Sequence, residues 1–88
     1  MNKERRKQLE KAIEKLNEAM SIFEDAKSII ETCKDEEEEY KDNMPENLQG
    51  SEKYERAESA VDSLEEAFDA LDELDIESVI SSIEEAME

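Results

Sequence analysis

The chain's only proline and only glycine lie within one short stretch, NMPENLQGSEKYE, at residues 43–55. These two residue types disfavour helix interiors more strongly than any others. The long segments on either side of the stretch contain neither of them. Because the only strong helix breakers are gathered at one point, the chain is expected to form two helical arms joined by a turn.

Apolar residues of the first arm follow a seven-residue repeat. One position of the repeat carries Leu9, Leu16, Phe23 and Ile30, then Glu37 and Met44. The position three residues later carries Ala12, Ala19, Ala26, Cys33 and Tyr40. Two such positions per repeat are typical of the seam between packed helices, so we expect a helix over residues 2–43. Further apolar residues beside the seam, Ile13, Met20, Ile22 and Ile29, indicate a second neighbour.

The turn is expected at residues 44–50. Met44 precedes Pro45, and the residue before a proline disfavours the helical conformation. Gly50 suits the left-handed position that closes a helical turn. Ser51 is a favourable N-cap, so the second helix is expected over residues 51–74.

The second arm repeats the seam and then loses it. The seam residues are Tyr54, Ala57, Val61, Leu64, Phe68 and Leu71. The repeat next meets Asp75 and Ser78, and a new apolar phase starts at Ile76. Residues 75–87 are therefore expected to form either a short third helix capped by Asp75 or a kinked continuation of the second helix.

These patterns predict an all-α fold in which residues 1–88 form a single domain, an antiparallel helical hairpin. A hairpin of two helices has no closed core, so its larger apolar side chains need a further partner. We expect a homodimer that forms a four-helix bundle. Its expected core residues are Leu16, Phe23, Ile30, Leu64, Phe68 and Leu71. The alternative is that another protein covers these side chains.

The net charge of −17 is concentrated in the later part of the chain. Residues 1–34 carry eight basic and seven acidic residues, whereas residues 35–88 carry three basic and 21 acidic residues. A surface this negative repels nucleic acid and anionic membranes. The expected partner is therefore a protein with a basic surface, and we expect no direct binding to nucleic acid or to a membrane.

The sequence also indicates where the protein acts. No apolar run is long enough to span a membrane, and the basic start is not followed by the apolar region of a secretory signal. A single cysteine, Cys33, fits a reducing environment. We therefore expect a cytoplasmic protein.

Most catalytic and metal chemistry is disfavoured by the residue types present. The chain lacks histidine and a glycine-rich phosphate loop, which excludes His-based catalysis and Cys/His zinc sites. A catalytic carboxylate pair needs a shielded pocket, which a small hairpin does not offer. The run DEEEEY at residues 35–40 lacks the alternating ligands and the glycine of an EF-hand loop, so a solvated helix face is favoured over calcium binding. We expect no catalytic residue, no cofactor and no metal.

Carboxylates recur every three or four residues along the second arm. The candidate partner-binding residues among them are Glu58, Asp62, Glu65, Asp69 and Asp72. Such steps place side chains about 5–6 Å apart on one helix face, a spacing on the scale of the phosphates along a DNA strand. This face could occupy a basic groove built for DNA. The alternative is that the carboxylates only keep the helix soluble, although the scarcity of lysine in this arm favours mimicry.

The turn is a second candidate contact surface. Its candidate binding residues are Asn43, Pro45, Glu46, Asn47 and Gln49. The turn is longer than a chain reversal requires, and loops on rigid scaffolds often carry contacts. The alternative is a structural role as the cap of the apolar end of the bundle.

The segment PENLQGSE, from Pro45 to Glu52, lies between a basic helical start and an acidic helix. This arrangement resembles small uncharacterised proteins encoded by phages and prophages of Gram-positive bacteria, over most of the chain. The resemblance implies a viral protein in the cytoplasm of a bacterial host, and it supplies no catalytic residues. Small acidic phage proteins include inhibitors of restriction, CRISPR and other defence enzymes, some of which are DNA mimics.

These features predict a noncatalytic binding protein that inhibits or modulates a host nucleic-acid-handling or defence protein. The acidic face and the turn would be its contacts. The alternative is a structural or assembly protein of the coiled-coil type with no separate target.

Overall fold

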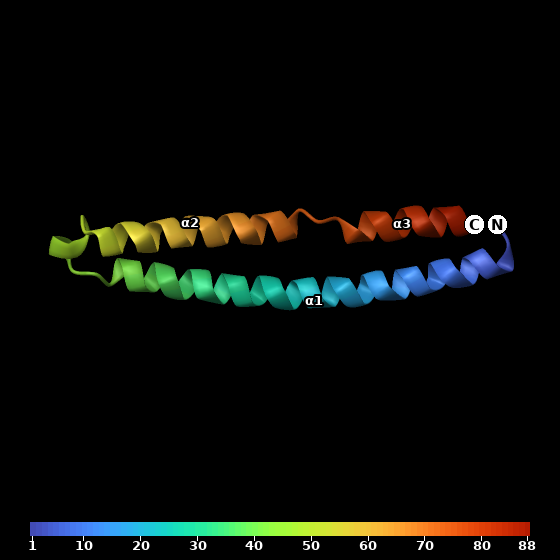
Figure 1. Cartoon of the computed structure of the whole chain (residues 1–88), viewed down its shortest axis with the longest axis horizontal. Helices are drawn as coiled ribbons and strands as arrows, with labels where there is room; N and C mark the ends of the chain where they lie inside the picture. The colour runs from blue at the N-terminus through green and yellow to red at the C-terminus, as the bar shows by residue number, and fades with distance from the viewer. The chain divides into compact units, whose positions relative to one another are not determined.

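The computed structural model describes all 88 residues, Met1–Glu88, and is built from helices alone. Its elements are α1 (Lys3–Asp42), the 3-10 helix η1 (Glu46–Leu48), α2 (Glu52–Asp72) and α3 (Ile76–Met87) (Figure 1). Helix covers 86% of the chain and there is no strand. The predicted all-α class is therefore confirmed, while the dimeric four-helix bundle stays a prediction.

The residues group into two compact units. Unit 1 comprises Met1–Asp25 together with Leu74–Glu88, and unit 2 comprises Ala26–Glu73. The helix α1 contributes its first part to unit 1 and its last part to unit 2. Each unit thus pairs one part of α1 with a later helix, α3 in unit 1 and α2 in unit 2.

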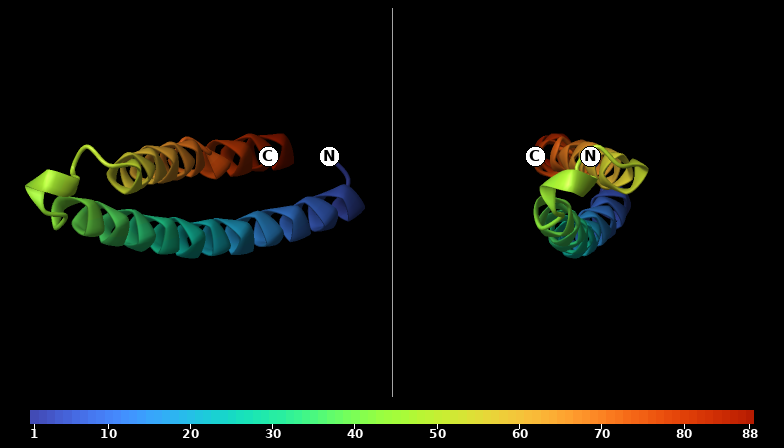
Figure 2. Two further views of the ribbon diagram at one scale, coloured as in Figure 1. Left: turned by 60° about the vertical axis from the view of Figure 1, so that its left-hand side comes forward. Right: turned by 90° about the vertical axis from the view of Figure 1, so that its left-hand side faces the viewer.

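In unit 2 the last part of α1 and α2 lie side by side in opposite directions (Figure 2). The Lys41 Nζ atom lies 5.9 Å from the centre of the Tyr54 ring, and the Lys27 Nζ atom lies 5.2 Å from that of Phe68. The two lysines are 14 residues apart (41 − 27), and the two rings are also 14 residues apart (68 − 54). The two helices therefore pair in a constant antiparallel register: each residue further along α1 lies level with a residue one position earlier on α2.

The connection between α1 and α2 consists of short, locally bonded turns. The Leu48 amide donates to the Pro45 carbonyl at 2.9 Å, and the Ser51 amide donates to the Leu48 carbonyl at 3.0 Å. Gly50 does not have a positive φ, so the predicted left-handed glycine was wrong. The physical reason is that η1 and the turn after it divide the reversal between them, which leaves no single residue in a strained conformation.

Both predicted helix caps are present. The Ser51 hydroxyl oxygen accepts a hydrogen bond from the Tyr54 amide at 3.3 Å, at the start of α2. The Asp75 carboxylate accepts one from the Ser78 amide at 3.0 Å, at the start of α3. An N-cap of this kind satisfies an amide that has no partner within the helix. Because Asp75 caps a new helix, α2 and α3 are separate elements rather than one continuous rod.

In unit 1, α3 lies beside the first part of α1, and both chain termini lie at the same end of the unit (Figure 1). Ile80 is the buried residue of this unit. Half-buried side chains of α1 also belong to unit 1, among them Leu9, Leu16 and Phe23. Each pair of helices therefore buries one narrow apolar strip, as expected for two helices without a third neighbour.

The core of the molecule is thin. Only Ala57, Val61 and Ile80 are buried, and the first two of these belong to unit 2. The six residues expected to form a dimer core, Leu16, Phe23, Ile30, Leu64, Phe68 and Leu71, are all half-buried. The chain thus leaves most of its seam partly accessible.

The seam of α1 in unit 2 follows one of the two predicted positions, with Ile30, Glu37 and Met44 half-buried, but not the other. Cys33 and Tyr40 were expected on it and are exposed, whereas Lys34 and Lys41, one residue later, are half-buried. The reason is geometric, because a seven-residue repeat on a straight α-helix rotates by about 20° per repeat. By the last part of α1 this rotation has moved Cys33 and Tyr40 out of the seam and brought the two lysines into it.

Candidate functional site

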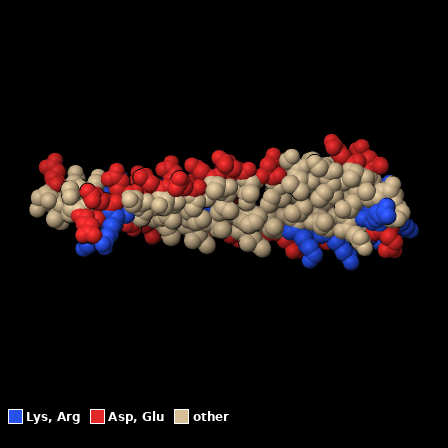
Figure 3. Space-filling view, turned by 45° about the horizontal axis from the view of Figure 1, so that its top comes forward, with Lys and Arg blue, Asp and Glu red and all other residues tan.

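The carboxylates of α2 gather on one flank of the helix. Glu58, Asp62, Glu65, Asp69 and Asp72 are all exposed. They follow one another at steps of four and three residues, which places them within a sector of about 80° around the helix axis. Figure 3 shows a row of Asp and Glu side chains along one edge of the molecular surface. We call Glu58, Asp62, Glu65, Asp69 and Asp72 the carboxylate row.

The carboxylate row is almost free of positive charge. No Lys or Arg occurs from residue 57 to residue 88. On α2 itself the basic residues are Lys53 and Arg56, and the Arg56 guanidinium pairs with Glu52 at 2.5 Å. An anionic surface that is not neutralised within its own chain attracts cationic groups of other molecules.

Asp72 differs from the other members of the row. Its Oδ1 atom lies 2.7 Å from the Nζ atom of Lys27, which reaches it from α1. The Lys27 side chain is only 14% exposed, and its ammonium also lies over the Phe68 ring. Asp72 therefore fastens α2 to α1, whereas Glu58, Asp62, Glu65 and Asp69 have no cation within ion-pair distance and remain available to a partner.

The second predicted surface, at the turn, is also accessible. Asn43, Pro45, Glu46, Asn47 and Gln49 are all exposed, and they come from the residue that follows α1, from η1 and from its two neighbours. The Gln49 side-chain amide donates to the Met44 carbonyl at 3.5 Å, which ties this side chain to the turn. The carboxamides of Asn43 and Asn47 make no such bond, so they can donate to and accept from another molecule.

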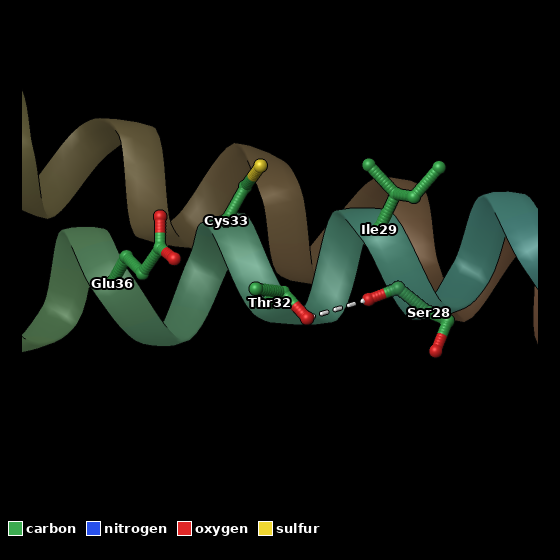
Figure 4. A pocket seen from close by; sticks show the side chains of 5 residues that line it. All are labelled: Ser28, Ile29, Thr32, Cys33 and Glu36. Atoms are coloured by element: carbon green, nitrogen blue, oxygen red, sulfur yellow. Dashed lines mark hydrogen bonds between the residues drawn. The ribbon is translucent and has the colours of Figure 1, made fainter.

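A third surface on α1 contains Ile29, which the sequence indicated as a contact to a second neighbour without identifying the residues around it. Ser28, Ile29, Thr32, Cys33 and Glu36 line an open hollow of about 310 Å³ (Figure 4). The Thr32 hydroxyl donates to the Ser28 carbonyl one turn back at 3.0 Å, so its proton is already used within the helix. The signal was present in the sequence, because Ile22 and Ile29 do not fit the main repeat.

Two kinds of site have no counterpart in the structure. No group of three or more Cys, Asp or Glu side chains converges in a way that could hold a metal ion. No helix combines the length and the apolar character that a bilayer span requires.

No protein-family model matches this chain, and no curated protein or solved structure shows significant similarity to it.

Proposed function

We propose that this chain is a noncatalytic binding protein whose carboxylate row occupies the basic groove of a protein that handles nucleic acid. The observation that carries the proposal is the one-sided charge of α2. Its exposed carboxylates Glu58, Asp62, Glu65 and Asp69 lack cationic partners, and the chain has no basic residue after Arg56. A helix that only needed solubility would mix both signs of charge on its surface.

The physical basis is competition for counter-ions and for space. A groove that binds DNA uses Lys and Arg to neutralise phosphates, and the same side chains are attracted to a row of carboxylates. Carboxylates at steps of three and four residues stand about 5–6 Å apart, so neighbouring cations of a groove can be met in sequence. Occupation of the groove would exclude the nucleic acid and inhibit the target.

The turn supplies the second contact in this proposal. Asn43 and Asn47 offer unpaired carboxamides beside the exposed Pro45 and Leu48. Polar amides next to an apolar side chain suit a small, specific contact, while the carboxylate row supplies attraction at longer range. The target we propose is a host defence or nucleic-acid-handling protein, and the setting is a phage or prophage in a bacterial cytoplasm. These two parts rest on the resemblance of Pro45–Glu52.

The test begins with capture of the target from a lysate of a Gram-positive bacterium on the immobilised chain. The charge-reversed variant D62K/E65K/D69K is compared with the wild type. A matched control, E10K/E14K/E18K, reverses three exposed carboxylates of α1 in unit 1 and changes the net charge equally, from −17 to −11 (−17 + 6). We expect retention in the control, loss in the α2 variant, and elution of the target by added salt.

Either of two results would reject the carboxylate row as the contact. One is target binding that is indifferent to salt. The other is an equal loss of binding in both variants, which would show that net charge alone matters.

A second candidate function, assembly through helix packing, is favoured by the exposed apolar side chains. Ile29 is 65% exposed and Tyr40 is 47% exposed, and neither belongs to the seam with α2. Exposed apolar side chains that share a helix face often mark a surface where another chain packs. The expected homodimer belongs to this proposal and is compatible with the first, because the carboxylate row lies on a different surface.

A further inference from the structure

The face of α1 beside its seam carries an unpartnered apolar row in unit 2. One exposed carboxylate, that of Glu36, interrupts this face between Cys33 and Tyr40. Ile29, Cys33 and Tyr40 are separated by four and seven residues, so they lie within about 40° of one another around the helix axis. All three are exposed. Figure 4 shows the Ile29 and Cys33 side chains pointing the same way from the helix. We call these three residues the α1 row.

The matching feature of α2 is its second flank, opposite the carboxylate row. Arg56, Ala60, Ser63 and Ala67 follow one another at steps of four, three and four residues. Apart from Arg56 these side chains are small and neutral, and Ser63 and Ala67 are exposed. Because both helices are right-handed and run in opposite directions, this neutral flank and the α1 row lie on the same side of unit 2. Figure 3 shows such an uncharged surface beside the row of acidic side chains.

We infer that this common face binds a second copy of the chain, with the α1 row of each copy lying on the neutral flank of the other copy's α2. Two chains that each carry a net charge of −17 repel wherever their carboxylates meet. The neutral flank is the side of α2 where this repulsion is smallest. Its alanines also leave room for the larger Ile29 and Tyr40 side chains, so that the helices can approach closely.

Charge complementarity sets the direction of the second copy. Lys41 lies over Tyr54 in unit 2, so Glu36, five residues back on the exposed face of α1, is level with residue 59 on α2, about one turn from Arg56. A two-fold axis parallel to the helices keeps these levels, and it places Glu36 of each copy within about one helical turn of Arg56 of the other. The two α1 helices then run parallel, each α1 lies antiparallel to the other copy's α2, and the four segments form a bundle.

The inference specifies the interface of the expected homodimer, and it does not depend on target binding by the carboxylate row. Sedimentation equilibrium of the full chain tests it. We expect the wild type to have twice the chain mass of 10.2 kDa. The substitution Ile29→Asp should raise the dimer dissociation constant about 100-fold, because two apolar side chains lose their burial.

Two substitutions on α2 that each add one carboxylate, at different positions, test which side of the helix forms the dimer interface. Ala67→Glu adds a carboxylate to the neutral flank and should produce a monomer. Ala70→Glu adds the same charge to an exposed position on the side of α2 that faces away from α1, and should leave the dimer intact. Circular dichroism confirms that each variant keeps the helical content of the wild type, as expected for exposed positions.

Two further measurements test the direction of the second copy and the burial of the α1 row in the dimer. Arg56→Glu should weaken the dimer several-fold, and adding Glu36→Arg to it should restore the affinity. Cys33 should react more slowly with a maleimide in the wild-type dimer than in the Ala67→Glu monomer. A monomeric wild type or a dimer that survives Ile29→Asp would overturn the inference. Equal effects of Ala67→Glu and Ala70→Glu, no rescue by Glu36→Arg, or equal maleimide rates would also overturn it.

Discussion

Few individual side chains hold this molecule together. Ala57 and Val61 in unit 2 and Ile80 in unit 1 are the buried ones. An alanine contributes little apolar area of its own, so Val61 is the larger of the two buried side chains between α1 and α2. A small domain buries a low fraction of its surface and has little stability to spare. Changes at these few positions should therefore have large effects.

Val61→Ala should lower the free energy of unfolding by about 2 kcal/mol, because two buried carbon atoms are lost and a small cavity remains. Val79 offers the matched control, since it is 49% exposed where Val61 is 7% exposed. Urea denaturation followed by circular dichroism measures both variants. If Val79→Ala were as destabilising as Val61→Ala, the two side chains would not differ in burial as described.

At the scale of elements, the contact between α1 and α2 carries charge where a coiled coil carries apolar residues. Lys27, Lys34 and Lys41 recur every seven residues along the seam of α1, and Glu37 lies between the last two. Lys27 pairs with Asp72 and Lys41 lies over Tyr54, but Lys34 reaches only its neighbour Asp35, at 4.0 Å. A half-buried lysine with so distant a partner contributes little beyond its alkyl chain.

Lys34→Leu should therefore stabilise the fold, by roughly 1 kcal/mol, because an apolar side chain extends the seam at no loss of a strong ion pair. Lys53→Leu is the control, since Lys53 is exposed and the same change there buries nothing. Thermal unfolding of the two variants decides the matter. A lower melting temperature for Lys34→Leu would show that the Lys34 ammonium makes a contact that matters.

The separation of α2 from α3 depends on a cap. Asp75→Ala removes the carboxylate that accepts the Ser78 amide, and should destabilise α3 by about 1 kcal/mol. Asp75→Asn retains a side-chain oxygen and should behave as the wild type. Hydrogen exchange of the α3 amides reports the effect locally. Faster exchange in both variants, or in neither, would contradict a role for the cap.

The sequence was a good guide to elements whose signals are local. The helix breakers near Pro45 and the caps Ser51 and Asp75 act within one turn, so their effect can be deduced from neighbouring residues. One of the two seam positions was predicted along the whole of α1, whereas the other was right only as far as Ala26, because a small rotation per repeat accumulates over the 40 residues of α1. That rotation is why Cys33 was expected inside and lies outside. The carboxylate row was found because exposure and spacing follow from one helix alone, whereas the α1 row depends on where the seam lies.

At the scale of the whole molecule, charge is the dominant property. The chain carries 28 acidic and 11 basic residues, and the ion pairs within its units include Lys27–Asp72, Lys34–Asp35 and Arg56–Glu52. Repulsion among the remaining carboxylates opposes the compact state. It also gives the surface a strong field of one sign, which would attract a basic partner from a distance.

Added salt should therefore stabilise this protein. The melting temperature is expected to rise between about 10 mM and about 300 mM NaCl, because screening weakens the repulsion among exposed carboxylates. The variant E10K/E14K/E18K, with a net charge of −11 (−17 + 6), should show a smaller rise. A melting temperature that falls with salt, or an equal rise in both proteins, would mean that repulsion is not what limits stability.

Competition between this chain and DNA for one groove is the most direct test of the carboxylate row. The captured target is bound to a fluorescently labelled DNA duplex, and the chain is then added while anisotropy is recorded. We expect the wild type and E10K/E14K/E18K to displace the duplex and D62K/E65K/D69K to fail. Formation of a ternary complex, with the duplex still bound at saturating wild-type chain, would contradict the account.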